Sequence, residues 1–434
     1  MCALNVEKGM GLKMNIIKKI QRKIKEQGLI KFICFCVTTL LYIIVKSIFL
    51  SMLKLTKVDD KTILFSSEPD FSDNSKALYE YYINCDKYKD YKYIWLISKN
   101  KNTKKYNYAN TKFIKSESSM HNGKTLKSLY YISKSKVLYF THSSPVNCNK
   151  KKKNQLVINL WHGCGYKNIQ SSNTSFIERQ PFDYALVPGK IFVNTKTKFW
   201  GCDKKQVMTI GYPRFDLLIK ENKTTEEFVN CLKKDNKLIL WMPTFRNTGK
   251  GYYPEEQIEK MFDLPLLNSE KELIELNKIC KKHKVLLCIK RHPRQLKYSC
   301  EKEKFSNIIF INNDTLIKEN IDLYSLLKYT DGLITDYSSV AIDYILLDKP
   351  IGFTLDDFEK YSKTRGFVFE NPKDYMPGHH IYNFDDMRQY IEDIGNNNDW
   401  YKENRHSIMN EVHNPCKNYC ERIVKKIEKL KEEI

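Results

Sequence analysis

The sequence predicts an α/β protein of two domains, each with a mostly parallel sheet. The chain has 434 residues, which is enough for two ordinary domains with separate cores. Short apolar runs bounded by polar residues alternate with longer helical patterns, as expected of βαβ units. A polar stretch low in strand-forming residues, 219–236, divides this alternation and is expected to be a hinge.

Composition restricts the class of partner. A hydrophobic content of 42%, with 28 Tyr and 22 Phe, argues against disorder. The formal net charge of +22 suggests an anionic partner. Residues 1–31 carry eight Lys or Arg against two Glu, and residues 99–153 carry fourteen Lys against Glu117. Charge alone does not distinguish a nucleic acid, an acidic membrane surface or a polyphosphate polymer, and part of the excess is expected to be a solvated face.

The cysteines indicate a reducing compartment. There are thirteen of them, an odd number, and no two are spaced as C-x-x-C. This distribution fits neither a zinc site nor a disulfide framework. The simplest compartment is therefore the cytosol.

Residues 1–56 are expected to associate with a membrane. A basic helical pattern at 16–27 is followed by Gly28 and an apolar segment at 29–53. The longest uncharged run, 32–45, has fourteen residues, whereas about twenty are needed to span a bilayer. We therefore expect monotopic attachment to the inner leaflet, with the basic helix on anionic headgroups. The alternative is a buried helix of the first domain.

The two α/β domains are predicted at 57–222 and 223–434. Strands of the first are expected at 63–65, 93–97, 137–140, 156–160, 183–187 and 206–210, with helices at 75–83 and 124–132. In the second, strands are expected at 237–241, 285–289 and 308–311, with helices at 269–283 and 321–327. The stretch 332–369 has the pattern of strand, polar turn, helix, turn and strand. Near the C-terminus a docking face is predicted from apolar residues at helical spacing: Cys420, Ile423, Val424, Ile427, Leu430 and Ile434.

Four predicted strands end in clusters of polar residues that core packing would not require. These clusters are His162 to Lys167, Pro243 to Arg246, Lys290 to His292, and Asp336 to Ser339. In open parallel sheets, ligands bind outside the carboxyl ends of the strands. The clusters are therefore predicted to line one crevice between the two domains.

The residue types in these clusters suit a diphosphate. Arg246 and Arg291 would neutralise its charge. Ser338 and Ser339 lie at a predicted helix N-terminus, where hydroxyls and backbone amides together would hold a phosphate. The alternative is that Asp336 or Ser338 only caps the helix.

Other residues at these strand ends suit proton transfer and close binding. His162 and His292 have side chains that titrate near neutral pH. Each histidine alone would more often be structural, but two at equivalent strand ends beside arginines favour a functional role. Gly163 would let the backbone approach a ligand closely, as would Gly165. Asp343, one turn into the helix, would reach a ligand hydroxyl.

The motifs LWHGCGYKNI, GYPRFD, MPTFRNT, IKRHPRQ and TDYSSVAIDYILLDKP resemble, in this order, the CDP-glycerol glycerophosphotransferase family. This family comprises primases and polymerases of wall teichoic acids and related polyol-phosphate polymers, and the resemblance covers roughly residues 130–400. It implies a fold like that of the B-type glycosyltransferases (GT-B), with two Rossmann-like domains facing a cleft. It also implies monotopic membrane association and transfer of a polyol phosphate from a CDP-activated donor to a hydroxyl.

The resemblance also implies roles for individual residues. The WHG histidine of the family falls on His162, which would be the general base. The residues matching its other motifs would bind the CDP-polyol or stabilise charge on the diphosphate, with the downstream acid holding a polyol hydroxyl. They are Gly163, Arg214, Pro243, Thr244, Arg246, Arg291, His292, Ser338, Ser339 and Asp343. Where many members have Thr-Pro after WHG, this chain has Cys164-Gly165, which loosens the loop.

The expected partners follow from the same resemblance. They are CDP-glycerol or CDP-ribitol, a lipid-linked or polymeric acceptor, and the cytoplasmic face of the cell membrane, to which the protein would attach peripherally. Glycerol phosphate is the expected unit and ribitol phosphate the alternative. No carboxylate pair suggests a metal cage, so no tightly bound metal or cofactor is expected, and Mg²⁺ would arrive with the diphosphate donor.

Two further alternatives come from other classes of protein. A glycosyltransferase using a nucleotide sugar would need the same fold and the same cationic crevice. A basic, membrane-associated anion-binding protein would need no catalysis. The aromatic residues lie in predicted strand cores rather than among the basic residues, so a nucleic-acid partner is not expected.

Overall fold

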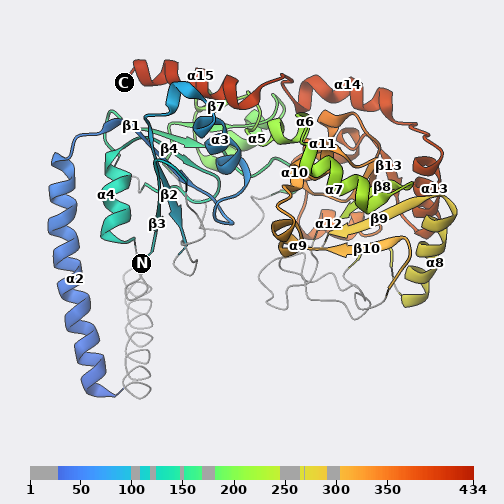
Figure 1. The fold of residues 1–434 in the computed structure, drawn as a ribbon, viewed down its shortest axis with the longest axis horizontal. Coiled ribbons are helices and arrows are strands. Elements are labelled where there is room, and N and C mark those ends of the chain that lie inside the picture. Colours follow the sequence, from blue (N-terminus) through green and yellow to red (C-terminus); the bar gives the residue numbers. More distant parts are fainter. Residues whose placement is uncertain are drawn as a thin grey trace, which may run out of the picture.

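The computed structural model describes residues 28–98, 108–117, 124–146, 151–168, 181–244, 264–267, 269–290 and 304–434. These residues form two parallel sheets flanked by helices, which confirms the predicted fold class (Figure 1). The predicted basic helix at 16–27 lies outside the described residues.

The first domain is built on a seven-stranded parallel sheet in the order β3-β2-β1-β4-β5-β6-β7. Its strands are β1 (Asp59–Ser66), β2 (Lys92–Ile97), β3 (Thr111–Lys115), β4 (Ser135–Phe140), β5 (Leu156–Asn159), β6 (Tyr184–Leu186) and β7 (Val207–Met208). The helices are α3 (Asp73–Ile83), α4 (Leu126–Lys134), α5 (Phe192–Trp200) and α6 (Phe215–Ile219). Strand β3 was not predicted because, as an edge strand, it buries a single side chain, that of Ile114.

The second domain has a six-stranded parallel sheet in the order β10-β9-β8-β11-β12-β13. Its strands are β8 (Lys237–Met242), β9 (Val285–Lys290), β10 (Ile308–Ile311), β11 (Gly332–Thr335), β12 (Ile351–Thr354) and β13 (His379–Ile381). Its helices are α8 (Glu270–Lys282), α9 (Asn313–Lys318), α10 (Leu323–Lys328), α11 (Ser339–Tyr344), α12 (Phe358–Thr364) and α13 (Phe384–Gly395). The predicted strand, turn, helix, turn and strand at 332–369 correspond to β11, α11 and β12.

The polar stretch at 219–236 contains a helix, α7 (Lys223–Lys233). Asn222 caps it by accepting a hydrogen bond from the Thr225 amide (3.0 Å). Thr225 and Val229 are buried. The stretch expected as a hinge is therefore largely an ordered amphipathic helix.

Strand order reverses at one place in each sheet, between β1 and β4 in the first and between β8 and β11 in the second. Ligands of doubly wound sheets bind at such switch points, beyond the carboxyl ends of the strands. The segments that follow these four strands lead to Asp73, His142, Thr244 and Asp336. The topology therefore predicts a ligand site at these loops.

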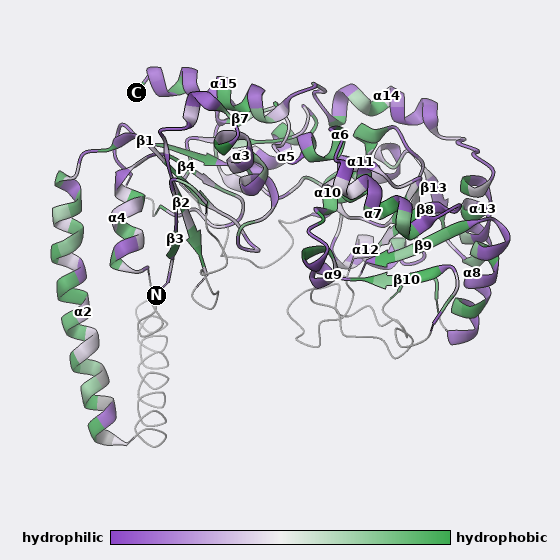
Figure 2. Ribbon diagram, in the orientation of Figure 1, coloured by the Kyte–Doolittle hydropathy of each residue, from purple (hydrophilic) through white to green (hydrophobic). Residues whose placement is uncertain are grey.

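Helix α2 (Leu29–Leu55) extends beyond the first domain and is apolar along most of its length (Figures 1 and 2). Its segment Cys36–Leu55 has a mean hydropathy of 2.0 and is long and apolar enough to cross a membrane, by length and composition alone. Only 6% of this apolar stretch is buried inside the protein. The alternative of a buried helix of the first domain is therefore wrong. The length of the apolar segment was underestimated from the uncharged run at 32–45, because the helix continues past Lys46.

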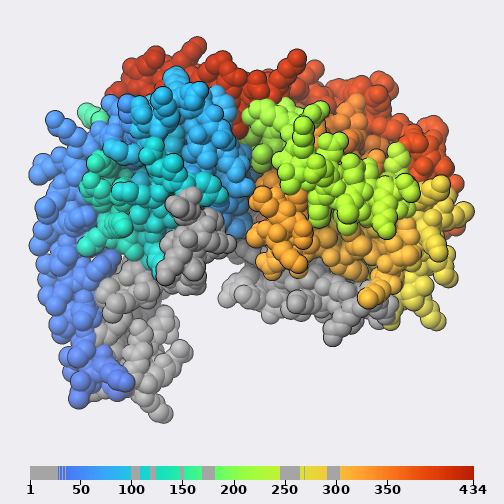
Figure 3. Space-filling model, viewed as in Figure 1, coloured from blue at the N-terminus to red at the C-terminus, as the bar shows by residue number. Residues whose placement is uncertain are grey.

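The C-terminal helices α14 (Lys402–Val412) and α15 (Tyr419–Glu432) return the chain from the second domain to the first (Figures 1 and 3). Helix α15 packs against α3 and α6. Its predicted docking face is confirmed at all positions except Ile434, which is exposed; the buried positions are Cys420, Ile423, Val424, Ile427 and Leu430.

A backbone connection also joins the two domains. Lys167 and Phe367 form an antiparallel bridge, and the Val368 amide donates to the Tyr166 carbonyl (2.8 Å). The Tyr166 hydroxyl donates to the Tyr375 carbonyl (2.6 Å). The segment after the His162 loop is therefore fixed to the second domain.

Asp216 provides a test of how α15 docks. Its carboxylate accepts hydrogen bonds from the amides of Tyr419 (2.6 Å) and Cys420 (3.1 Å), the first residues of α15. Asp216→Ala should lower the free energy of unfolding by about 1–2 kcal/mol, since these amides lose their acceptor. Urea denaturation measures this change. Asp385→Ala, which removes an exposed pair with Arg388, should cost less than about 0.5 kcal/mol; equal losses in the two variants would contradict the assignment.

Candidate active site

The loop after β5 presents His162. The Trp161 amide donates to Asn159 Oδ1 (2.9 Å), and Asn74 Nδ2 donates to the Trp161 carbonyl (2.8 Å). Trp161 has a positive φ of 53° and Gly163 one of 133°, backbone conformations that L side chains rarely adopt. The two asparagines and the glycine therefore hold the sharp turn in which His162 lies.

The His162 ring is half-buried and has three close neighbours. It stacks on His142 with ring centres 4.1 Å apart and an interplanar angle of 9°, and its centre lies 4.0 Å from that of Trp161. Its Nδ1 lies 3.3 Å from the Thr141 carbonyl oxygen. Because a carbonyl oxygen only accepts, this contact assigns the proton to Nδ1 and leaves Nε2 with its lone pair.

The surroundings of His162 hold its pKa well below the ordinary value. The causes are burial first, then the neighbouring His142, with smaller contributions from Lys196 and Arg214. Lys196 is itself buried, and its Nζ lies 4.6 Å from the ring centre of Trp161 and 5.0 Å from that of Phe199. The imidazole is therefore neutral near pH 7 and able to accept a proton.

The glycines after His162 bring this loop against the second domain. A Cβ on Gly163 would lie 2.6 Å from Ser339 Oγ, and one on Gly165 would lie 2.9 Å from the Ser339 amide nitrogen. Real Cβ atoms essentially never approach this closely. The two glycines thus allow the His162 loop to contact the start of α11.

Arg214 connects the His162 loop to both domains. Its guanidinium donates to Asp73 Oδ1 (2.7 Å), to the His162 carbonyl (2.9 Å) and to Asp343 Oδ2 (2.6 Å). It also lies over the Tyr324 ring, 4.6 Å from its centre. Arg214 is 3% exposed, so this is a buried, doubly neutralised cation.

Asp343 is the partner of Arg214 from the second domain. It is fully buried, and its Oδ2 also accepts from the Tyr324 hydroxyl (2.6 Å). Burial raises the pKa of Asp343, and Arg214 opposes that rise. Its Oδ1 has no hydrogen-bond partner among the residues described. Its contact with a ligand hydroxyl stays a prediction.

The ends of β8 and β11 are joined by a buried hydrogen-bond pair. Asp336 Oδ2 accepts from the Thr244 amide (3.0 Å) and Oδ1 from the Thr244 hydroxyl (2.5 Å). Pro243 is buried beside them. Ser338 is the N-cap of α11 and its side chain accepts from the Val340 amide (3.5 Å). The capping role considered for Ser338 is therefore present, and Ser339 faces the His162 loop.

The structure brings together part of the predicted site. His162, Gly163, Arg214, Ser339 and Asp343 form one connected group across the two domains. The predicted Arg246, Arg291 and His292 lie outside the described residues, so their roles, and the facing of His162 and His292, stay predictions.

Sequence reasoning missed several members of this group. His142 follows β4, so the rule that found the other strand ends would have found it too. Asp73 and Tyr324 carry no such signal, since one begins a helix in a polar stretch and the other lies in a short helix. Lys196 lies within an ordinary amphipathic helix.

No group of three or more His, Cys, Asp or Glu side chains that could hold a metal ion occurs in the part of the chain that the structure describes. The described site is instead made of an imidazole, hydroxyls, backbone amides and a paired guanidinium. Groups of this kind bind oxygen-rich, anionic substrates and exchange protons with them. The expectation about Mg²⁺ stays a prediction.

Two facing parallel α/β domains, with these groups at the carboxyl ends of their strands, define a GT-B-like transferase scaffold. The family model of CDP-glycerol:poly(glycerophosphate) glycerophosphotransferases matches residues 48–429. The chain therefore belongs to this family.

Several characterised teichoic acid enzymes are similar in sequence. The teichoic acid glycerol-phosphate primase of Bacillus subtilis is 30% identical over 287 residues, covering 62% of this chain and 68% of the primase. The ribitol-phosphate primase of Bacillus spizizenii is 28% identical over 270 residues, and the match spans 58% of this chain and 64% of that protein. The poly(glycerol phosphate) polymerase of the same organism is 28% identical over 354 residues, covering 75% and 82%.

The fold matches that of a wall teichoic acid polymerase, TagF. The TM-score is 0.66 at 24% identity, with 92% of this chain and 98% of that chain covered. A structure of a TagF variant soaked with CDPG gives a TM-score of 0.65 at 22% identity over 93% and 98% of the two chains. This likeness confirms the two-sheet architecture.

The lowered pKa of His162 can be measured directly. In a histidine-labelled protein, NMR titration should place it below about 6.5, the ordinary value for imidazole. His142→Phe keeps a stacked ring but removes a group that becomes positive on protonation. Loss of that repulsion should raise the His162 pKa. His406→Phe, at an exposed histidine paired with Asp348, should leave it unchanged, and an unshifted pKa in both variants would contradict the electrostatic account.

The pairing of Arg214 with Asp343 should stabilise the fold strongly. Asp343→Ala leaves a buried guanidinium without its partner from the second domain, which should cost about 3–5 kcal/mol. Glu80→Ala removes a more exposed pair with Lys76 and should cost less than about 1 kcal/mol. Urea denaturation compares the two. A loss below about 1 kcal/mol for Asp343→Ala would show that the pair does not couple the domains.

Proposed function

We propose that this protein transfers glycerol phosphate from a CDP-activated donor to a hydroxyl of a lipid-linked or polymeric acceptor at the membrane, releasing CMP. The observation that carries the proposal is the family match over residues 48–429. The matched range spans both the His162 loop and Ser339, which lie against each other in the structure. Similarity to a glycerol-phosphate primase and a poly(glycerol phosphate) polymerase supports the choice of donor.

His162 is the general base in this proposal. Its Nδ1–H donates to the Thr141 carbonyl, so Nε2 accepts the proton of the acceptor hydroxyl. The acceptor oxygen forms a bond to the phosphorus that carries the glycerol. The bond from that phosphorus to the CMP oxygen breaks, and CMP leaves with the electron pair. Because the ring is neutral near pH 7, no prior deprotonation is needed.

Arg214 acts in this scheme through position rather than by binding phosphate. Asp73 and Asp343 already neutralise its charge, and the guanidinium is buried. Its bond to the His162 carbonyl fixes the backbone that carries the base. Stabilisation of the diphosphate charge is assigned to Ser338 and Ser339, and to the predicted Arg246, Arg291 and His292.

Attachment to the cytoplasmic face of the membrane is supported by α2. Most of its large apolar side chains are exposed, among them Ile30, Leu40, Leu41, Ile48 and Met52. Exposed apolar surface on this scale is characteristic of membrane or protein contact. The basic residues at 1–31 would add attraction to anionic headgroups.

Replacement of His162 tests the mechanism. With CDP-glycerol and a lipid-linked acceptor, His162→Ala should release CMP at least ~10²-fold more slowly than the unmodified protein. His406→Ala should retain the full rate. Near-normal CMP release from a folded His162→Ala protein would remove this residue from the role of base.

Parallel incubations with CDP-ribitol and with nucleotide sugars identify the donor. Faster CMP release from CDP-ribitol would replace glycerol phosphate by ribitol phosphate, and transfer from a nucleotide sugar would indicate a glycosyltransferase. Salt-sensitive binding to anionic polymers without CMP release from either CDP-polyol would favour a binding protein.

A further inference from the structure

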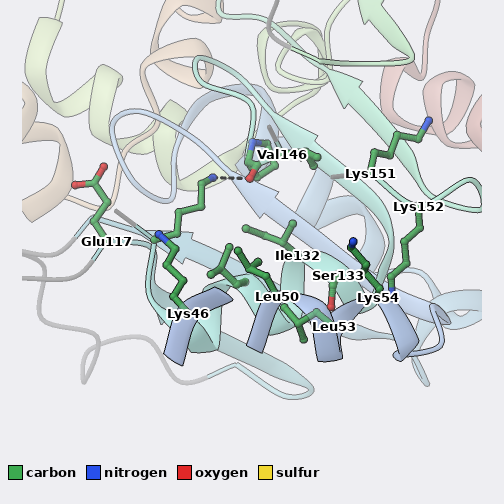
Figure 4. A pocket seen from close by; sticks show the side chains of 13 residues that line it. Lys46, Leu50, Leu53, Lys54, Glu117, Ile132, Ser133, Val146, Lys151 and Lys152 are labelled. Atoms are coloured by element: carbon green, nitrogen blue, oxygen red, sulfur yellow. Dashed lines mark hydrogen bonds between the residues drawn. The ribbon is translucent and has the colours of Figure 1, made fainter. Parts of the chain in front are cut away.

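A cavity of about 580 Å³ lies between α2 and the first domain (Figure 4). Helix α2 forms one wall, and α4 and the residues around Val146 form the other. The Tyr42 hydroxyl donates to the Lys124 carbonyl (3.1 Å), and Thr56 Oγ1 lies 3.2 Å from Ser133 Oγ. Two polar contacts therefore attach α2 at opposite ends of the cavity. This volume is typical of small-molecule sites.

The rim of the cavity is strongly basic. It carries Lys46, Lys54, Lys124, Lys151 and Lys152 against a single acid, Glu117. Lys151 pairs with Asp183, and Lys152 donates to Thr56 Oγ1 (2.7 Å). Within the described residues, Lys46, Lys54 and Lys124 form no ion pair. Lys152 is held by a hydroxyl, so four of the five lysines, Lys152 and these three, lack a carboxylate partner among the described residues.

Lys124 is the most enclosed of these three. Its Nζ donates to the Pro145 carbonyl (2.5 Å), and its side chain lines the cavity. Burial lowers the pKa of Lys124 to about 8. An anion in the cavity would offset the loss of hydration around this ammonium group.

The interior of the cavity is apolar. Leu50 and Leu53 contribute from α2, and Leu129, Ile132 and Val146 from the domain. A small inorganic anion would leave this apolar surface exposed to water. A sugar-phosphate polymer would also leave it uncovered, because such a polymer has no hydrocarbon chain. A molecule with both a phosphate and a hydrocarbon chain matches both parts of the cavity.

We propose that this cavity binds one anionic glycerophospholipid, with its headgroup at the basic rim that carries Lys46, Lys54 and Lys124 and an acyl chain on the leucines of α2. The chain would continue along the exposed apolar surface of α2 (Figure 2). This site rests on the proposed membrane attachment and adds a specific headgroup to it. A bound lipid would fix the orientation of the first domain relative to the bilayer.

The test uses the full-length protein and vesicles of phosphatidylcholine with or without phosphatidylglycerol. Lys54→Gln with Lys124→Gln removes two rim charges. Lys57→Gln with Lys127→Gln removes two exposed charges outside the cavity, each three residues along the chain from a rim lysine of that pair. Leu50→Trp fills the cavity without changing charge. Lys46→Gln with Lys54→Gln gives a second rim pair on α2 alone, in case Lys124→Gln impairs folding.

Vesicle flotation measures how much more tightly each protein binds vesicles that contain phosphatidylglycerol than vesicles of phosphatidylcholine alone. A lysine near an anionic membrane surface changes binding by roughly fivefold in general, and the control pair should show only this effect. The rim pairs should lose at least about tenfold more than the control pair, and Leu50→Trp should also lose the phosphatidylglycerol-dependent gain.

Equal losses in the rim and control pairs, or full gain in Leu50→Trp, would overturn the lipid site. Binding to phosphatidylcholine vesicles separates this result from a failure of the membrane proposal. If the unmodified protein binds neither vesicle, membrane attachment itself is wrong. If it binds both equally, attachment holds and the phospholipid site does not.

Discussion

The buried pair between Arg214 and Asp343 is the interaction on which the site depends. One guanidinium joins α3, the His162 loop and α11 by three hydrogen bonds of 2.6–2.9 Å. An Arg can do this because its planar fork presents several donors in fixed directions, whereas a Lys could not reach all three acceptors with the same geometry. The position of the His162 loop in one domain is thus set by a carboxylate of the other.

The glycines around this pair have a related role. Gly163 and Gly165 remove the side chains that would separate the His162 loop from Ser339. Cys164-Gly165 was expected to loosen the loop, yet the loop is held by Asn74, Arg214 and the bridge at Lys167. The expected loosening is therefore offset by contacts that come from distant parts of the chain.

Much of the fold could be predicted because parallel strands buried on both faces leave a clear apolar signal. The rule that polar residues follow the carboxyl ends of strands located His162 and Ser339, whose segments the structure brings together. It did not find Arg214: a strand was predicted at 206–210, but β7 ends at Met208 and Arg214 follows only after several further residues. Only the family motif located it. Asp73 and Tyr324 could not be predicted, because their importance comes from contact with a guanidinium far away in sequence.

The positively charged side chains of the site and of the α2 cavity differ in whether carboxylates neutralise them. Arg214 has two carboxylates within 2.7 Å and is sealed from solvent. Of the five lysines that line the cavity, only Lys151 has a carboxylate partner among the described residues, and Lys124 is hydrogen-bonded to a carbonyl. The buried cation of the site is thus neutralised twice, whereas most lysines around the apolar cavity have no carboxylate partner among the described residues. An anion from outside the chain would stabilise these lysines.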